Sequence, residues 1–354
     1  MQIHQIMPSI SYGDAVSGHA LEIRDILREW GYESDIYAQN IHPRLKKIVR
    51  AYTEYNKISS PENVLLFHFS IGSDISRFVK NLPDKKVLIY HNITPSIFFS
   101  GVNDNLANLV RNGRDELAEY NDIADLALGD SEYNRKELVE LGFRNTGVFP
   151  IILDLNKYNR EPNQEILNNF IDEYTNLIFV GRISPNKKQE DIIKIFYYYN
   201  KFIDPNSRLF LVGSYEGMEI YHNQLKNLIK RLNLENVYIT GHVDFCELLA
   251  YYKLADVFIS MSEHEGFCVP LLESMHFSIP IIAYNSTAIP YTLKNTGILA
   301  NKKKYGEIAE MVYLLVNDET LRKKIIQKQR LRLKDFEKPK VEEIFKSYIN
   351  EVIK

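Results

Sequence analysis

Short runs of apolar residues alternate along the first half of the chain with longer stretches in which apolar residues recur at helical spacing. The apolar runs predict β-strands at 3–6, 33–37, 64–69, 86–90 and 126–128. The longer stretches predict helices at 20–30, 73–81, 104–122 and 132–141, and a loop at 13–18. This alternation indicates a parallel sheet covered by helices on both faces.

The second half repeats the pattern with sharper strand ends. Buried strands are predicted at 176–180, 208–212, 237–240, 257–260 and 281–283, and a helix is predicted at 189–202. Several of these strands run directly into glycine or polar residues. In doubly wound sheets the carboxyl edge of the strands holds the ligand, so we expect a binding site at this edge.

The fold class is therefore α/β, with two Rossmann-like doubly wound parallel-sheet domains. The segment 150–162 contains two prolines, several asparagines and no sustained period, which is typical of a domain boundary. We place the first domain at 1–155 and the second at 156–338. The tail, 339–354, begins with proline and has the apolar spacing of a helix.

Composition and charge bear on the binding partners and the cellular compartment of the protein. The 354 residues carry 43 Lys and Arg against 46 Asp and Glu, a net charge of −3 that does not suggest nucleic-acid binding. Two cysteines fit a reducing compartment, and no signal peptide or membrane-spanning apolar run is present. We therefore expect a cytoplasmic protein. A small basic amphipathic patch, Arg44, Lys46, Lys47 and Arg50, leaves peripheral contact with an anionic membrane open.

The densest cluster of candidate chemistry is SEHEGFCVPLLESMHFSIP at 262–280. Pro270 suits a first helical turn, so Glu265 should lie in the loop before a helix and Glu273 about one turn inside it. The amides of Gly266, Phe267 and Cys268 would then face a ligand at the helix N-terminus, where negative charge or sugar oxygens are favoured. Glu273 could accept hydrogen bonds from a vicinal diol such as ribose. Alternatively, both glutamates only cap or solvate the first turn.

A second candidate site follows the strand at 176–180. Arg182 and Lys187 combine a planar fork of donors with a point charge, which suits a diphosphate, although an ordinary solvated loop is the alternative. Gly13, after the first strand, would let backbone approach a phosphate. His91, after the strand at 86–90, could donate to a sugar hydroxyl or move a proton, or it could be a satisfied core histidine.

The sequence lacks the signature motifs of several classes of binding and catalytic site. No G-x-x-x-x-G-K-[ST], G-x-G-x-x-G after a strand, G-x-S-x-G, D-x-D or metal-binding histidine spacing is present. We therefore expect no metal site and no resident cofactor. Cys268 has no visible histidine partner, so we read it as structural rather than nucleophilic.

Taken together, VGRISPNKKQ, LVGS, TGHV and ISMSEHEGFCVPLLESMHFSIPIIA resemble the retaining glycosyltransferases of family 4, which have the GT-B fold. The amino half matches less sharply, through GDAVSGHA, YHNITP and GDSEYNRKEL. The resemblance implies a central cleft between the two domains and a C-terminal helix that crosses back onto the first. It also implies retaining, metal-independent transfer of a hexosyl group from a UDP- or GDP-sugar to a glycan or lipid-linked saccharide, in surface polysaccharide synthesis.

The resemblance also implies roles for single residues. Arg182 and Lys187 would bind the donor diphosphate, Glu273 the ribose, and Glu265 with the amides of 266–268 the donor sugar. Ser214 and Val243 would lie near the base or diphosphate, Gly13 near the phosphates, and His91 near the reacting carbon. Two positions depart from the family pattern, because Lys188 and Asp14 stand where many relatives carry glycine.

Other functions remain open at this point. A sugar-nucleotide epimerase of the same fold would convert its donor without an acceptor. A phosphorylase, or a glycosidase using Glu265 and Glu273 as its carboxylate pair, is a weaker alternative. A non-catalytic nucleotide-sugar-binding subunit would bind the donor without turnover. The oligomeric state leaves no trace in the sequence.

Overall fold

The computed structural model describes residues 1–11 and 13–354. Two compact units contain these residues. Unit 1 comprises Met1–Ile97, Asp104–Asp154 and Asp335–Lys354, and unit 2 comprises Phe98–Asn103 and Leu155–Lys334. The short segment Phe98–Asn103 therefore clusters with unit 2 although its neighbours in sequence belong to unit 1, which the apolar pattern did not predict.

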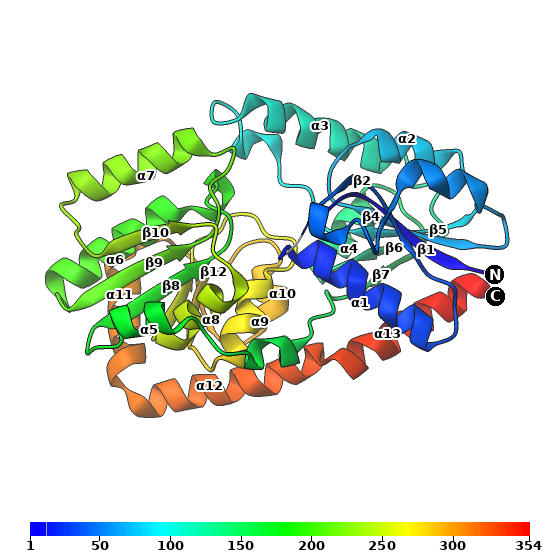
Figure 1. The fold of residues 1–354 in the computed structure, drawn as a ribbon. Coiled ribbons are helices and arrows are strands. Elements are labelled where there is room, and N and C mark those ends of the chain that lie inside the picture. The colour runs from blue at the N-terminus through cyan, green and yellow to red at the C-terminus, as the bar shows by residue number, and fades with distance from the viewer. Residues whose placement is uncertain (12) are drawn as a thin grey trace. The chain divides into compact units, whose positions relative to one another are not determined.

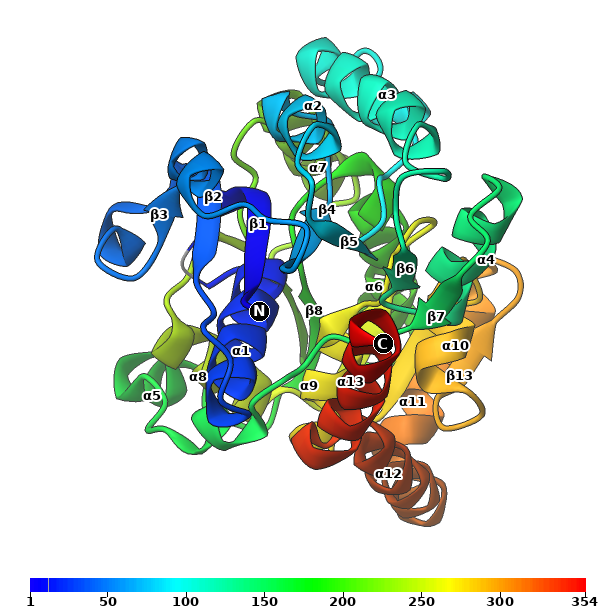
Figure 2. The ribbon, with the colours of Figure 1, turned by 90° about the vertical axis from the view of Figure 1, so that its right-hand side faces the viewer.

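Unit 1 is built on a seven-stranded sheet in the order β3-β2-β1-β4-β5-β6-β7, which Figure 2 shows from left to right. All its strand pairs are parallel. The strands are β1 (Ile3–Ile10), β2 (Ile36–Ile41), β3 (Arg50–Ala51), β4 (Val64–Phe69), β5 (Lys85–Tyr90), β6 (Leu126–Gly129) and β7 (Thr146–Val148). Because β1 pairs with both β2 and β4, the chain reverses its direction of winding there, which makes this point a ligand site in doubly wound sheets.

Helices cover both faces of this sheet. The helices are α1 (Ala15–Glu29), α2 (Asp74–Lys80), α3 (Asp104–Ala118), α4 (Glu132–Glu140) and α13 (Lys338–Ile353). Apolar residues of α1 and α13 share one core with strands β1, β4, β5 and β6. Figures 1 and 2 show α1 and α13 on the same face of the sheet, with α2 and α3 on the other.

The C-terminal helix completes the core of unit 1. Phe345 of α13 stacks on Phe149 with ring centroids 4.8 Å apart and on Trp30 at 5.5 Å. Tyr348 adds a polar contact, because Val148 N–H donates to its hydroxyl at 3.1 Å. Val341, Ile349 and Val352 are buried on the same helix. The last twenty residues therefore belong structurally to the first unit, which is the return of the chain that the family resemblance implied.

Unit 2 contains a six-stranded parallel sheet in the order β10-β9-β8-β11-β12-β13. The strands are β8 (Thr175–Val180), β9 (Ser207–Val212), β10 (Val237–Gly241), β11 (Val257–Ser260), β12 (Ile281–Tyr284) and β13 (Ile298–Ala300). Its helices are α5 (Gln164–Phe170), α6 (Gln189–Phe202), α7 (Glu219–Arg231), α8 (Phe245–Leu254), α9 (Val269–His276), α10 (Ile289–Leu293), α11 (Tyr305–Asn317) and α12 (Glu319–Leu333). Helices α6, α7 and α11 bury their apolar faces in one cluster against the sheet.

The winding of unit 2 reverses between β8 and β11. The chain moves outward from β8 to β9 and β10, then returns to β11 on the other side of β8. The loops that leave β8 and β11 therefore lie side by side at the carboxyl edge, where open parallel sheets bind ligands.

Short 3-10 helices occupy parts of the connections. They are η1 (Pro43–Leu45), η2 (Tyr52–Lys57), η3 (Ser96–Phe98), η4 (Leu155–Asn159), η5 (Pro185–Lys187) and η6 (Lys334–Phe336). The basic patch at 44–50 forms no continuous helix, because Arg44 lies in η1, Arg50 lies in the short edge strand β3, and the two lysines lie in the turn between them. Arg50 pairs there with Asp35 at 2.9 Å, while Lys46 and Lys47 are exposed.

Two local predictions in unit 1 were wrong. The segment 13–18 is not wholly a loop, because α1 begins at Ala15 and Gly18 lies inside it. Asp14 explains the early start, since its carboxylate accepts from Val16 N–H at 3.2 Å and Ser17 N–H at 3.1 Å as a helix cap. The second strand begins at Ile36 rather than at 33, and it continues to Ile41.

Candidate functional site

The loops after β8 and β11 carry six of the predicted site residues, three of them with charged side chains. Arg182 follows β8 in an exposed position, and Lys187 ends the short helix η5 of the same loop. Glu265 lies in the loop between β11 and α9, with its side chain 8% exposed. The Nζ atom of Lys187 lies 2.6 Å from Oε2 of Glu265, so the structure joins two residues that stand 78 positions apart.

Two further hydrogen bonds tie these loops together. Asn186 Nδ2 donates to the carbonyl oxygen of His264 at 3.1 Å, and Glu263 N–H donates to the carbonyl oxygen of Asn186 at 2.8 Å. Asn186 is buried, so water competes little for these bonds. The cation of Lys187 and the carboxylate of Glu265 therefore stand on two loops that are hydrogen-bonded to each other.

Lys188 occupies a position whose backbone conformation favours glycine. Its backbone is in the left-handed region, with φ of 55°, between η5 and α6. Glycine adopts this conformation without steric cost, whereas other residues are strained there. In this chain the lysine side chain enters a charge network, with Nζ 3.4 Å from Glu263 and 3.6 Å from Glu190.

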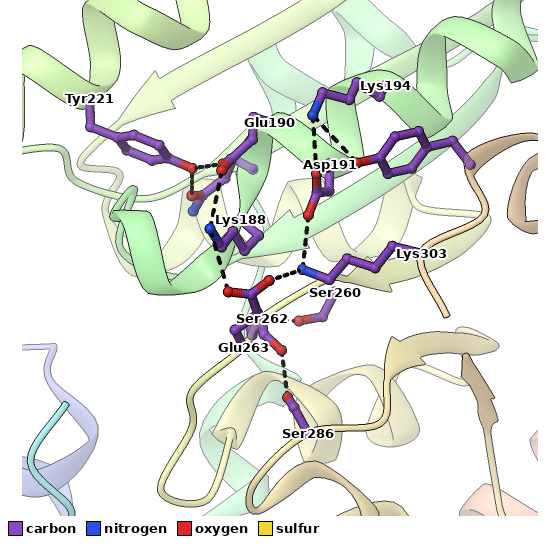
Figure 3. A network of polar contacts seen from close by, with 12 residues as sticks. Lys188, Glu190, Asp191, Lys194, Tyr221, Ser260, Ser262, Glu263, Ser286 and Lys303 are labelled. Atoms are coloured by element: carbon purple, nitrogen blue, oxygen red, sulfur yellow. Dashed lines mark hydrogen bonds and ion pairs between the residues drawn. The ribbon is translucent and has the colours of Figure 1, made fainter. Parts of the chain in front are cut away.

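Figure 3 shows Glu263 between Lys188 and Lys303. Lys303 Nζ lies 2.7 Å from Glu263 and 2.8 Å from Asp191 at the start of α6. Burial alone would raise the pKa of Asp191, but hydrogen bonds from Lys303 and Tyr305 outweigh burial and lower that pKa. The network thus connects the loop after β11 to the first turn of α6.

Glycines let the strand ends of unit 2 approach closely. Gly213 follows β9 with φ of 150°, and a Cβ there would collide with the carbonyl oxygen of Gly181. The next residue, Ser214, accepts from Ile183 N–H at 2.9 Å through its carbonyl oxygen. Arg182 reaches across the same gap, since Nη2 donates to the carbonyl oxygen of Glu216 at 2.8 Å. Val243 follows the neighbouring strand β10, so Ser214 and Val243 lie at the predicted edge of the sheet.

The segment from Glu265 to Cys268 leads into α9 as predicted. Cys268 adopts a left-handed conformation, with φ of 71°, and α9 begins at the next residue with Pro270 in its first turn. Phe267 is buried, and its carbonyl oxygen accepts from the hydroxyl of Thr292 at 2.7 Å. Burial raises the pKa of the Cys268 thiol well above its usual value, which opposes thiolate formation and fits a structural cysteine. Gly266 lies between Glu265 and Phe267 in the same segment.

Glu273 neither caps α9 nor faces water, so that alternative reading is wrong for this residue. It is buried inside the helix, with 7% of its surface exposed. Its two carboxylate oxygens accept from the hydroxyls of Tyr158 at 2.5 Å and Tyr252 at 2.6 Å. Burial, with the carboxylate of Glu273 beside it, raises the pKa of Tyr252 well above its usual value, which keeps the phenol a donor. Sequence spacing gave no signal for either tyrosine.

His91 of unit 1 lies at the carboxyl end of β5 as predicted, but its ring is engaged inside the unit. Nδ1 lies 2.9 Å from Asp130 Oδ2, and Nε2 lies 2.8 Å from His68 Nδ1. Neither Asp130 nor His68 was expected as a partner of His91. Their only signal was position, because His68 lies on β4 and Asp130 directly follows β6, the two strands that neighbour β5 in the sheet.

Gly13 lies between β1 and α1, at the point where the winding of unit 1 reverses. It has φ of 86° and is exposed, which is the backbone freedom that the prediction required. Asp14, the second departure from the family pattern, serves as the cap of α1 described above.

Among the described residues, no group of three or more His, Cys, Asp or Glu side chains is arranged to hold a metal ion. Within the same ranges, no helix has both the length and the apolar character needed to cross a membrane.

Comparison with known proteins bears on the family. Residues 162–332 match the family model described as glycosyl transferases group 1. The chain is 30% identical over 188 residues to the capsular polysaccharide biosynthesis glycosyltransferase CapM of Staphylococcus aureus, covering 52% of this chain and 46% of that protein. It is 27% identical over 179 residues to the GalNAc-α-(1→4)-GalNAc-α-(1→3)-diNAcBac-PP-undecaprenol α-1,4-N-acetyl-D-galactosaminyltransferase of Campylobacter jejuni, covering 50% of this chain and 48% of that protein. These matches span about half the length of each relative.

Solved structures match over almost the whole chain. Sucrose-phosphate synthase from Thermosynechococcus elongatus superposes with a TM-score of 0.78 at 15% identity, covering 99% of both chains. HepE of Anabaena, in complex with UDP-glucose, gives 0.76 at 16% identity, covering 99% of this chain and 100% of that one. At these identities the likeness shows the fold, which is the predicted α/β GT-B fold with two Rossmann-like units. Unit 2 in addition matches the group 1 glycosyltransferase model from residue 162 to residue 332.

Proposed function

We propose that this chain is a glycosyltransferase that moves a hexosyl group from a UDP- or GDP-sugar to a saccharide or lipid-linked saccharide. The observation that carries the proposal is the joining of the β8 and β11 loops through Lys187 and Glu265 at the reversal point of unit 2. The match of this unit to the group 1 model supports it. The names of the two relatives, one from capsular polysaccharide biosynthesis and one citing a saccharide on undecaprenol, support a role in polysaccharide synthesis.

Arg182 and Lys187 are the proposed diphosphate ligands. Arg182 offers a planar fork of donors at the exposed edge, and Lys187 retains further ammonium hydrogens beside its bond to Glu265. Cleavage of the sugar–phosphate bond builds negative charge on the departing diphosphate. Two cations already fixed at that point stabilise this charge without reorganisation. We propose on this basis that turnover needs no divalent metal.

The remaining unit 2 residues define the rest of the proposed donor site. Glu265, with the segment from Gly266 to Cys268, would bind the hydroxyls of the donor sugar. Ser214 and Val243, at the ends of β9 and β10, would lie along the base or diphosphate.

Glu273 is proposed to bind the ribose. A carboxylate has about four acceptor positions, so two ribose hydroxyls can join the two tyrosine hydroxyls already bound.

The proposed roles in unit 1 are less direct. Gly13 would approach the donor phosphates through its backbone. Both ring nitrogens of His91 are occupied by Asp130 and His68. We therefore propose that His91 acts near the reacting carbon through the position of its loop, and not by moving a proton from its ring.

A transfer assay tests the function. Purified protein is incubated with UDP- and GDP-sugars, a panel of lipid-linked and free saccharide acceptors, and EDTA. Release of nucleotide that depends on one donor and one acceptor class supports the proposal. Retention of the anomeric configuration is the expectation from the family resemblance, and NMR of the product measures it. A change in the donor sugar with the nucleotide still attached would identify an epimerase instead, and donor binding without turnover with any acceptor would identify a binding subunit.

A further inference from the structure

Four side chains from four neighbouring strands of unit 1 form a continuous buried chain of hydrogen bonds. Gln5 comes from β1, His68 from β4, His91 from the end of β5 and Asp130 from the end of β6. Gln5 Oε1 lies 2.9 Å from His68 Nε2. His68 Nδ1 lies 2.8 Å from His91 Nε2, and His91 Nδ1 lies 2.9 Å from Asp130 Oδ2. All four residues are at least nine-tenths buried.

The Gln5 end of this chain has a fixed orientation. Gln5 Nε2 donates to the carbonyl oxygen of Ala20 in α1 at 3.0 Å. A carbonyl oxygen only accepts, so the amide nitrogen of Gln5 must face Ala20 and the amide oxygen must face His68. Because that oxygen also only accepts, the hydrogen of the next bond must be on Nε2 of His68.

The three bonds between Gln5 and Asp130 need three hydrogens. A neutral histidine brings one ring hydrogen, and an ionised aspartate brings none, so two neutral histidines and a carboxylate bring two. One bond would then join two lone pairs. We propose that this chain is a proton-binding site that takes up one extra proton on folding, held between His91 and Asp130.

The surroundings place the extra proton at the Asp130 end. Burial, with His91 and His19 nearby, lowers the pKa of His68 well below its usual value, so His68 remains neutral. Burial raises the pKa of Asp130, although His91 opposes this. The second oxygen of Asp130, Oδ1, is buried without a hydrogen-bond partner among the described residues, which disfavours an isolated carboxylate charge.

The described residues packed around this chain of hydrogen bonds supply no other charge that acts on Asp130 or His68. His19 of α1 packs edge-on to His68 and His91, and its Nδ1 accepts from Ile152 N–H at 2.8 Å. Burial lowers its pKa well below the usual value, so it is neutral too. From α4, Asn134 donates to the carbonyl oxygen of Tyr90, and Glu137 accepts from the Tyr90 hydroxyl. Within the described part of the chain, the charges that act on Asp130, His68 and His19 come from the histidines of this cluster.

The proton makes the cluster sensitive to pH. Free aspartate and histidine titrate near pH 3.9 and about 6.5, so the unfolded chain holds almost none of this proton at pH 8. Folding therefore takes up a proton, and the stability that the cluster provides is lost as pH rises. When the proton leaves, one bond of the chain must break and the ring of His91 is no longer fixed at the edge of the sheet.

Histidine NMR of the intact protein tests the proton count directly. With ¹⁵N-labelled histidine and ¹³C-labelled aspartate at pH 7, we expect Nε2 of both His68 and His91 to carry hydrogen, with His68 neutral. The third hydrogen should be on either Nδ1 of His91 or the carboxyl group of Asp130. His4 is the internal control. Its Nδ1 accepts from Asp35 N–H at 3.0 Å and its Nε2 lies 3.0 Å from Gln2 Oε1, which a neutral ring satisfies. A neutral His91 beside an ionised Asp130 carboxylate at pH 7 would overturn the proposal.

The variant Asp130→Asn tests the linkage to stability. An asparagine amide can donate to His91 Nδ1, so the three hydrogens are present without an extra proton. Between pH 7 and 9 we expect the unfolding constant of the wild type to rise, relative to the variant, by up to tenfold per pH unit.

Asp84→Asn is the matched control for this linkage. Asp84 is a buried carboxylate that accepts from the Tyr55 hydroxyl at 2.6 Å and from Ser59, so its bonds need no added proton. This variant should keep the wild-type slope, and equal slopes for wild type and Asp130→Asn would contradict the proposal. Both tests work without a sugar nucleotide, so their outcome is independent of the proposed function.

Discussion

The carboxyl edges of the two sheets hold their polar groups in different ways. In unit 2 the edge carries full charges on loops, with Arg182 exposed and the Lys187–Glu265 pair partly accessible. In unit 1 the equivalent edge carries a buried chain of His68, His91 and Asp130. Exposed cations can meet an incoming anion, whereas the members of the buried chain bond to one another. The first arrangement suits ligand binding and the second suits fixing a backbone.

The largest expected effect is a loss of stability in unit 1 that leaves nucleotide binding by unit 2 in place. Phe345→Ala removes a ring that stacks on Phe149 and Trp30, and it should destabilise the protein by about 3–5 kcal/mol. Denaturant unfolding measures this loss, with the exposed Ser347→Ala on the same helix as the control. Because Phe345 belongs to unit 1, nucleotide binding at low temperature should persist. An unchanged midpoint would show that the tail helix does not complete the core.

Arg182→Ala tests the edge of unit 2. Loss of one fixed cation at the leaving group should lower kcat by about 100- to 1,000-fold. The melting temperature without ligand should change little, because Arg182 is exposed. Lys201→Ala, at the exposed end of α6, is the matched cation control and should retain activity. Equal rates for the two variants would remove Arg182 from the proposed site.

Tyr252→Phe tests whether Glu273 must be held from both sides. The change deletes a 2.6 Å bond to a buried carboxylate, and it should cost about 1–3 kcal/mol of stability. We also expect a higher KM for the donor, since Glu273 would be less well placed for ribose. The neighbouring Tyr251, which packs on Phe210 at 5.2 Å, supplies the control Tyr251→Phe. A normal donor KM would mean that the tyrosine pair serves packing alone.

The smallest effect concerns the backbone at Lys188. Glycine fits φ of 55° without strain, whereas alanine does not, so Lys188→Gly should be more stable than Lys188→Ala by about 1 kcal/mol. Both variants lose the same partly exposed ion pairs, so the difference isolates the conformation. Thermal unfolding of the pair measures it. Equal stabilities would mean that the left-handed turn relaxes at little cost.

The difference between the two edges also explains what the sequence could predict. Arg182, Lys187, Glu265 and Glu273 belong to short contiguous motifs, and the turn at Cys268 and Pro270 follows from local rules. The alternation of apolar runs predicted the longer strands in the same way, but it gave no sign of the short strands β3, β7 and β13. The partners Tyr158 and Tyr252 of Glu273, and the chain from Gln5 to Asp130, come from distant segments. They meet only after the sheets form, so no spacing in the sequence marks them.

The central claim is that unit 2 binds a nucleoside diphosphate through Arg182 and Lys187. The most direct test is the melting temperature with UDP, GDP, ADP, CMP and TDP, each with magnesium and with EDTA. A ligand at about 100 times its dissociation constant should add about 2.7 kcal/mol of stability. The account predicts a selective increase with one nucleotide that survives EDTA and is lost in Arg182→Ala. No increase with any nucleotide, or an increase that Arg182→Ala leaves unchanged, would contradict it.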